Sequence, residues 1–122
     1  MIYVAIGGSR YFTSSDEAVI FNWLNYYLQN LLQQDSITIV NGGCRGCDLI
    51  AQKWANLNGC SVLTIVPDWN QGLKAGPLRN KELIKASDFV IAFLKEGEAC
   101  RGTHSLISEA KKAGKPLRIK KI

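Results

Sequence analysis

The chain has 122 residues, of which 47% are apolar and 20% are charged, and its formal net charge is +5 at pH 7. This length predicts one domain over residues 1–122, and the composition excludes a disordered chain. The positive charge is compatible with a small phosphate ligand, a nucleic acid or simple solubility. No apolar run approaches the ~20 residues of a membrane span and the first residues lack a signal-peptide pattern, so we expect a cytoplasmic protein that does not contact a membrane.

Five short apolar runs rich in β-branched and aromatic residues predict β-strands. Their apolar residues are continuous rather than alternating, which is typical of parallel strands covered on both faces. The runs comprise residues 3–6, 37–40, 62–66, 89–93 and, more weakly, 117–119.

Amphipathic segments between these runs predict helices within residues 16–32, 49–57, 77–87 and 103–113. Pro77 suits the first position of the third helix, and Thr103 suits the N-cap of the fourth, which ends at Gly114. The alternation of strands and helices predicts an α/β fold: a three-layer, Rossmann-like, doubly wound parallel sheet of about five strands.

Unusual polar and glycine-rich segments follow the first four predicted strands. In a parallel sheet these segments emerge at one edge, where open α/β sheets bind their ligands. We therefore expect one site built from four separate parts of the chain. The segments are residues 7–10, 42–48, 67–79 and 94–103.

The segment after the second strand, Asn-Gly-Gly-Cys-Arg-Gly-Cys-Asp, favours a phosphate site. Gly42, Gly43 and Gly46 permit close approach of a ligand to the backbone, the next helix begins with free N–H groups, and Arg45 can donate to a phosphate. A tight strand-to-helix turn capped by Asp48 explains the same residues equally well. The spacing is neither that of a P-loop nor that of the usual dinucleotide fingerprint.

The segments after the first and fourth strands have a similar character. Gly8, Ser9 and Arg10 offer a glycine turn, a hydroxyl and a cation, and Gly102 with Thr103 opens the last helix. Both segments are interpreted as phosphate contacts. A plain glycine turn and a simple threonine cap are the structural alternatives.

The third segment is long for an α/β connection, and long loops in compact domains are often functional. Trp69 can stack on a base, and Asp68 can accept a hydrogen bond from a ribose or base donor. Gly76, Arg79 and Asn80 complete the predicted ligand contacts in this segment. A tryptophan that covers the sheet edge is the alternative role for Trp69.

Cys44 and Cys47 form a C-x-x-C pair at a helix start, which is where a redox dithiol would lie. Small residues chosen for packing explain the pair better. A zinc site that also used Cys60 and Cys100 is disfavoured, because Cys60 precedes its strand on the opposite edge. The single histidine, His104, is interpreted as a surface residue. The sequence therefore predicts no metal and no bound cofactor.

The ordered set of motifs resembles the SLOG superfamily, the Rossmann-like group that includes the Smf/DprA and "lonely guy" proteins, and within it the small stand-alone YspA/YpsA-like branch. The resemblance rests on Gly-Ser-Arg, Gly-Gly-x-Arg-Gly-x-Asp, Asp-Trp with Ala-Gly-Pro-x-Arg-Asn downstream, and Arg-Gly-Thr, in that order. It implies binding of a nucleotide or nucleotide-derived ligand, such as an ADP-ribose or NAD-type molecule or a cyclic nucleotide.

The resemblance also implies two alternative functions. The lonely-guy enzymes hydrolyse the N-glycosidic bond of nucleoside monophosphates, but their catalytic glutamate position holds Leu106 here, which favours binding over catalysis. If the chain is an enzyme, Arg79 and Glu109 are the candidate catalytic residues. DprA relatives bind single-stranded DNA, although no series of alternating aromatic and basic residues is visible in this sequence.

Family analogy suggests a homo-oligomer. The aromatic residues Trp23, Tyr26 and Tyr27 of the first predicted helix are candidates for its interface, and a place in the core is their alternative role.

Overall fold

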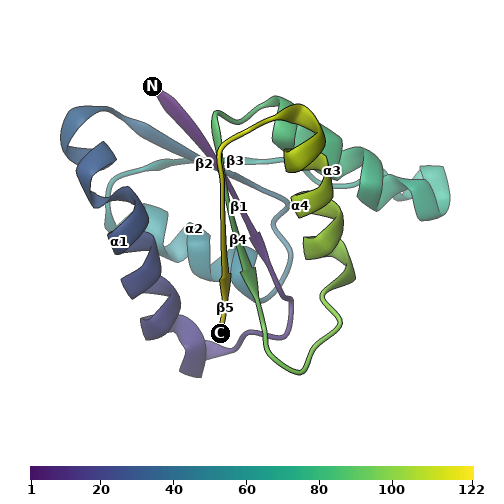
Figure 1. Cartoon of the computed structure of the whole chain (residues 1–122), viewed down its shortest axis with the longest axis horizontal. Helices are drawn as coiled ribbons and strands as arrows, with labels where there is room; N and C mark the ends of the chain where they lie inside the picture. The colour runs from purple at the N-terminus through teal and green to yellow at the C-terminus, as the bar shows by residue number, and fades with distance from the viewer.

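The computed structural model describes residues 1–122 and contains every predicted strand and helix, together with two short 3-10 helices. Figure 1 shows the strands in the middle of the molecule, with α1 and α2 on one side and α3 and α4 on the other. In chain order the elements are β1 (Ile2–Gly8), the 3-10 helix η1 (Ser14–Asp16), α1 (Glu17–Gln34), β2 (Ile37–Asn41), α2 (Cys47–Leu57), β3 (Ser61–Thr64), the 3-10 helix η2 (Trp69–Lys74), α3 (Ala75–Lys85), β4 (Phe89–Leu94), α4 (Arg101–Ala113) and β5 (Leu117–Lys121).

The sheet has the strand order β3-β2-β1-β4-β5, and every neighbouring pair is parallel. Helices cover both of its faces, so the predicted three-layer, Rossmann-like α/β fold is confirmed. The chain moves outward from β1 through β2 to β3 and then returns to β4 on the other side of β1. This reversal places the switch point, where doubly wound folds bind ligands, at the carboxyl ends of β1 and β4.

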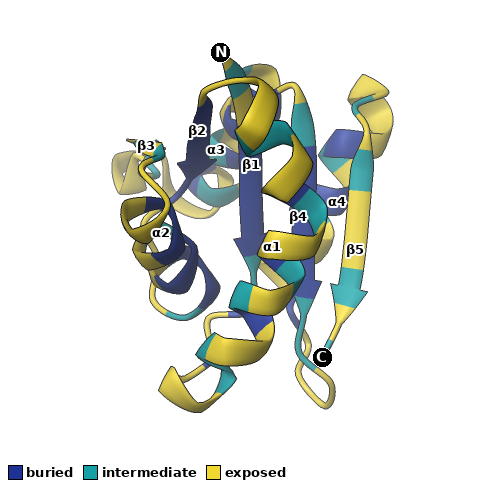
Figure 2. Cartoon of the chain, turned by 90° about the vertical axis from the view of Figure 1, so that its left-hand side faces the viewer, coloured by how far each residue is buried: buried dark blue, intermediate teal, exposed yellow.

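Two apolar clusters, one on each face, hold the helices to the sheet. Leu24 of α1 and Trp54 of α2 are buried on one face, and Leu83 of α3 and Leu106 of α4 are buried on the other. Each such side chain stabilises the fold by about 1.5–3 kcal/mol relative to an exposed position. Figure 2 shows that β1, β2 and β4 are buried over most of their length, whereas β5 is largely exposed.

Several element boundaries differ from the predictions by a few residues, and three of them concern the predicted site. The third strand ends at Thr64, and α3 begins at Ala75, two residues before Pro77. The fourth helix begins earlier than predicted, because Cys100 adopts a left-handed conformation (φ 50°) and acts as its N-cap. Thr103 is therefore a buried residue of the first turn and not the cap.

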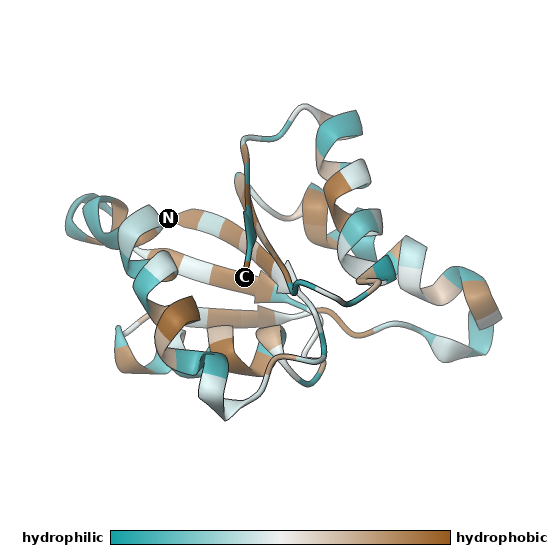
Figure 3. Cartoon of the chain, turned by 60° about the horizontal axis from the view of Figure 1, so that its bottom comes forward, coloured by the Kyte–Doolittle hydropathy of each residue, from teal (hydrophilic) through white to brown (hydrophobic).

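No helix combines the length and the apolar character that crossing a membrane requires. The apolar residues concentrate along the strands and on the helix surfaces that face them, as Figure 3 shows.

Candidate functional site

The loops after β1 and β2 pack directly against each other. A Cβ atom on Gly46 would lie 2.6 Å from backbone atoms of Arg10 and Ser9, so this close approach requires glycine. The backbone N–H of Cys47 donates to the carbonyl of Ser9 at 3.1 Å. The buried Ser9 hydroxyl accepts from the N–H of Tyr11, which leaves Ser9 with a structural role in the loop. The two predicted glycine-bearing bends therefore meet.

The glycine loop after β2 is held from inside by a buried carboxylate. Oδ2 of Asp48 accepts hydrogen bonds from the N–H groups of Gly42 at 3.2 Å and Cys44 at 3.1 Å. The N–H of Gly43 donates to the side-chain oxygen of Asn41. Three amides that could have faced a phosphate thus donate within the loop. Asp48 holds this turn together but is not the predicted cap, because the N-cap of α2 is Gly46 and no side chain caps that helix.

Asp48 is also the most strongly perturbed carboxyl group of the chain. Burial raises its pKa from 3.8 to about 6, whereas the donors in the loop and the Arg79 guanidinium act in the opposite direction. The folded loop therefore contains a carboxyl group that changes charge only about one pH unit below neutrality.

Arg79 reaches from α3 toward this loop. Its guanidinium lies against Gly42, where any side chain would overlap it, so this glycine makes room for the arginine. Nε of Arg79 donates to the side-chain oxygen of Asn80 at 3.1 Å. Nη1 is buried and has no hydrogen-bond partner. The arginine thus keeps one donor unused beside the carboxyl end of β2.

Asn80 connects this arginine to the start of α4. Its amide donates to the carbonyl of Gly102 at 3.2 Å. The N–H groups of Arg101, Gly102 and Thr103 have no acceptor in the structure, as expected for the first turn of a helix. The positive end of the α4 dipole therefore lies near Arg79, which creates an anion-binding arrangement at the carboxyl edge of the sheet.

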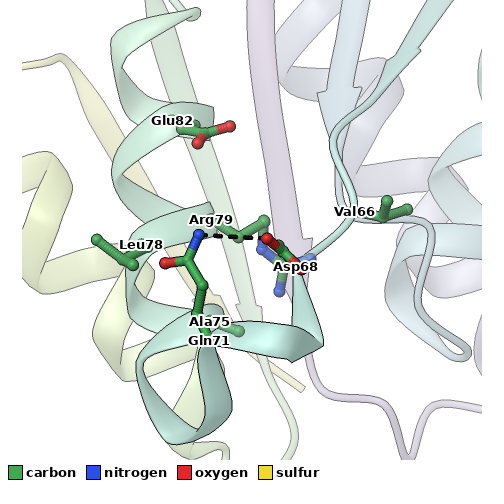
Figure 4. A pocket seen from close by; sticks show the side chains of 7 residues that line it. All are labelled: Val66, Asp68, Gln71, Ala75, Leu78, Arg79 and Glu82. Atoms are coloured by element: carbon green, nitrogen blue, oxygen red, sulfur yellow. Dashed lines mark hydrogen bonds between the residues drawn. The ribbon is translucent and has the colours of Figure 1, made fainter.

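A cleft of about 300 Å³ adjoins Arg79 between η2 and α3. Figure 4 shows Asp68 and Gln71 on one side of it, joined by a hydrogen bond of 3.3 Å, with Arg79 and Glu82 on helix α3. Asp68 also caps η2 by accepting from the N–H of Asn70. The lining residues are Val66, Asp68, Gln71, Ala75, Leu78, Arg79 and Glu82.

Sequence reasoning predicted two lining residues, Asp68 and Arg79, and missed the others. Glu82 was detectable, because a residue three positions after Arg79 lies on the same face of a helix. Trp69 is 68% exposed, so it does not cover the sheet edge, and it lies next to the cleft without lining it.

Two of the predicted glycines offer open space, and three others do not. A Cβ atom on Gly8, Gly43 or Gly46 would meet neighbouring atoms at less than 3.0 Å, so packing within the protein accounts for these glycines. Gly76 and Gly102 have nothing within 4 Å of that position. Gly102 also carries a free amide, so a ligand can approach the backbone closely at this position.

The other predicted residues have more peripheral positions. Arg10, Arg45 and His104 are exposed. Glu109, the candidate catalytic glutamate, lies in the middle of α4 and forms an ion pair of 3.6 Å with Lys112. It is therefore engaged outside the arrangement of Arg79 and the α4 start.

The cysteines are all free thiols, and they lie in different environments: Cys44 is exposed, Cys47 and Cys100 are buried, and Cys60 is half-buried. Burial and then the nearby Asp48 carboxylate raise the pKa of Cys47 well above its ordinary value, which opposes formation of a reactive thiolate. No group of three or more His, Cys, Asp or Glu residues is placed to hold a metal ion.

Comparisons with known proteins place this geometry in a family. The chain is 37% identical over 87 residues to the Gene 61 protein of Mycobacterium phage D29, a match that covers 66% of this chain and 69% of the phage protein. The X-ray structure of TM1055 covers 96% of this chain and 72% of its own, with a TM-score of 0.68 and 20% identity. DNA processing protein A (DprA) from Streptococcus pneumoniae covers 98% of this chain and 59% of its own, with a TM-score of 0.57 and 17% identity.

The two structural similarities show a shared fold. Residues 2–72, which are more than half of the 122, match the YAcAr family, described as the YspA, cpYpsA-related SLOG family. This match confirms the resemblance predicted from the loop motifs. The chain belongs to the YspA, cpYpsA-related SLOG family.

Proposed function

We propose that this chain binds a nucleotide or nucleotide-derived ligand at the carboxyl edge of its sheet, with a phosphate between Arg79 and the start of α4. The unpartnered, buried Nη1 of Arg79 carries the proposal. A buried donor without an acceptor costs about 1–3 kcal/mol, and a phosphate oxygen would offset that cost. Membership of a SLOG family supports a nucleotide-related ligand.

The rest of the ligand would extend into the cleft. Asp68 and Glu82 line it and can accept hydrogen bonds from ribose hydroxyls or base amino groups. Trp69 is exposed beside it and can stack on a base. Arg10 and Arg45, exposed on the neighbouring loops, would neutralise further phosphates, as a dinucleotide or ADP-ribose-like ligand would require.

The first test is a thermal-shift screen with AMP, ADP, ADP-ribose, NAD and cyclic nucleotides. A ligand at one hundred times its Kd adds about 2.7 kcal/mol to the free energy of unfolding, which gives a measurable shift. Arg79→Gln should weaken binding of the active compound by about tenfold or more, since hydrogen bonds to charged groups contribute about 1.5–3 kcal/mol. Arg118→Gln, which removes an arginine from β5, is the matched control. Absence of a shift with every compound would refute the proposal.

Gly102→Ala tests the phosphate position by itself. Alanine fits this helical position without a clash, so the variant should fold as well as the wild type or gain up to about 1 kcal/mol. The new methyl group would stand at the free amides of α4, and we expect ligand affinity, measured by isothermal titration calorimetry, to fall about tenfold. Gly76→Ala is the matched control, because Gly76 has the same open space but belongs to α3 and not to the first turn of α4. Equal affinities for both variants would place the phosphate elsewhere.

Hydrolysis of the same ligand is the second candidate, favoured by the carboxylates of Asp68 and Glu82 that share the cleft with Arg79. A carboxylate beside a bound ribose can act in general acid–base catalysis. Chromatography of a nucleoside monophosphate incubated with the protein would reveal free base if the chain is a hydrolase. That release should disappear in Glu82→Gln, whereas intact nucleotide after prolonged incubation would leave binding as the function.

A further inference from the structure

Helix α1 carries a cluster of mutually packed aromatic side chains. The ring centroids of Trp23 and Tyr26 are 5.6 Å apart in an edge-to-face arrangement, and those of Tyr26 and Tyr27 are 5.4 Å apart. Trp23 and Tyr27 also pack against the core, but Tyr26 is 74% exposed. The cluster therefore presents aromatic surface to solvent.

Strand β5 places cations over aromatic rings on the same side of the sheet. Nζ of Lys120 lies 4.0 Å from the centroid of the Trp23 ring, and the Arg118 guanidinium lies 5.8 Å from that of Phe89. Figure 2 shows α1 beside the edge of the sheet that β5 forms. The α1–β5 surface, as we name it, consists of Trp23, Tyr26, Tyr27, Phe89, Arg118 and Lys120.

The cations of this surface are not neutralised by ion pairs. Helix α1 has no acidic residue after Glu17, β4 and β5 have none, and neither Arg118 nor Lys120 forms an ion pair. The carboxylate at the end of α1, Asp35, is paired with the amino terminus at 2.8 Å. Glu96 lies beyond the end of β5, where its N–H donates to the Ile122 carbonyl.

These charges select among the candidate partners. A second copy placed on this surface by two-fold symmetry would bring two cationic surfaces together without a carboxylate to pair with them, which disfavours the oligomer interface considered for these aromatic residues. An anionic partner is favoured instead. An exposed tyrosine ring with neighbouring cations suits a strand whose bases are free to stack, whereas the bases of a duplex are already stacked on each other.

We propose that the α1–β5 surface binds single-stranded nucleic acid. Unpaired bases stack on the exposed Tyr26 ring, while Arg118 and Lys120 contact the backbone phosphates. Strands β1 and β4 separate β5 from the end of β2, where Arg79 lies, so this surface is distinct from the proposed nucleotide site. The inference goes beyond the proposed function and does not depend on it.

Fluorescence anisotropy of the full chain with a labelled 12-nucleotide oligothymidine tests the proposal. Wild type should bind this single strand more tightly than a duplex of equal length. Tyr26→Ala should weaken binding about fivefold or more through lost stacking. The double variant Arg118→Gln/Lys120→Gln should weaken it further and reduce the slope of log K against log salt by about 1.4, since each lost phosphate contact removes about 0.7.

A matched double variant on α3, Lys81→Gln/Lys85→Gln, removes the same charge from exposed positions elsewhere and should leave both affinity and slope close to wild type. Equal losses in the two double variants, tighter binding of the duplex, or binding of anionic phosphatidylserine vesicles without any binding of the oligonucleotide would each overturn the proposal. Loss of binding in Arg79→Gln but not in Tyr26→Ala would overturn it too, because the strand would then occupy the carboxyl edge. Thermal unfolding of every variant verifies that the fold is retained.

Discussion

Replacing Gly46 with alanine should lower the free energy of unfolding by about 3 kcal/mol or more. Gly46 has φ 80° and ψ −126°, a backbone conformation that costs a residue with a side chain about 1–3 kcal/mol. The added Cβ would also lie 2.6 Å from the backbone of Arg10 and Ser9, and a backbone cannot move aside as a flexible side chain can. The strain and the clash act together, so both loops must shift.

Chemical denaturation gives this change directly, and the melting temperature should fall by about 10 °C. Gly59→Ala is the control: Gly59 also has positive φ (69°), but nothing lies within 4 Å of the added Cβ. It should cost only about 1–2 kcal/mol, the conformational strain alone. If the two variants lose equal stability, the loops after β1 and β2 do not pack as described.

Asp48→Asn should remove a pH dependence of stability worth about 3 kcal/mol. The carboxyl group has a pKa of about 6 in the folded chain against 3.8 as the ordinary value, and a difference of this size corresponds to about 3 kcal/mol. A single oxygen, Oδ2, accepts both loop amides, so the carbonyl oxygen of asparagine can replace it. The variant therefore keeps the loop and loses the buried charge.

The sign follows from proton linkage. Between about pH 3.8 and pH 6 the folded chain binds more protons at Asp48 than the unfolded chain does, so stability falls as the pH rises through this window. The contribution is fully present below about pH 3.8 and lost above about pH 6. The lowered pKa values of Asp16 and Asp35 act in the opposite direction, so the informative quantity is the difference between the variant and wild type.

That difference should increase by about 2.4 kcal/mol in favour of Asp48→Asn between pH 4 and pH 7, measured by urea denaturation at each pH. Asp88→Asn changes an exposed carboxylate that accepts a backbone hydrogen bond from Tyr3, and it serves as the control. A difference that stays constant with pH would show that Asp48 is already ionised throughout this range.

The loop motifs predicted which edge of the sheet holds the site, but not how each residue is used. The three glycines at positions 42, 43 and 46 were interpreted as space for a phosphate. In the structure the space beside these glycines is filled by the protein itself. The neighbours are, in the same order, the Arg79 guanidinium, the Thr64 side chain and the backbone of Arg10. A positive φ or a close approach selects for glycine whether the neighbour is a ligand or the protein itself, so sequence cannot separate the two cases.

The sequence suggested only the aromatic residues of the α1–β5 surface, and the cations of β5 that join them were missed for a related reason. Trp23 and Lys120 are 97 positions apart in the sequence, and their contact depends on β5 pairing with β4 beside helix α1. A search for aromatic and basic residues that alternate along the chain therefore could not find them.

The sequence by itself determined the order of the elements, the parallel sheet and the edge at which the unusual loops gather. It could do so because hydrophobic periodicity and strand–helix alternation are local properties, and right-handed crossovers bring all carboxyl strand ends to one side. Only the tertiary structure decided which donors stay free. That outcome depends on contacts between distant segments, such as Asp48 taking the loop amides while Nη1 of Arg79 and the first amides of α4 remain without acceptors.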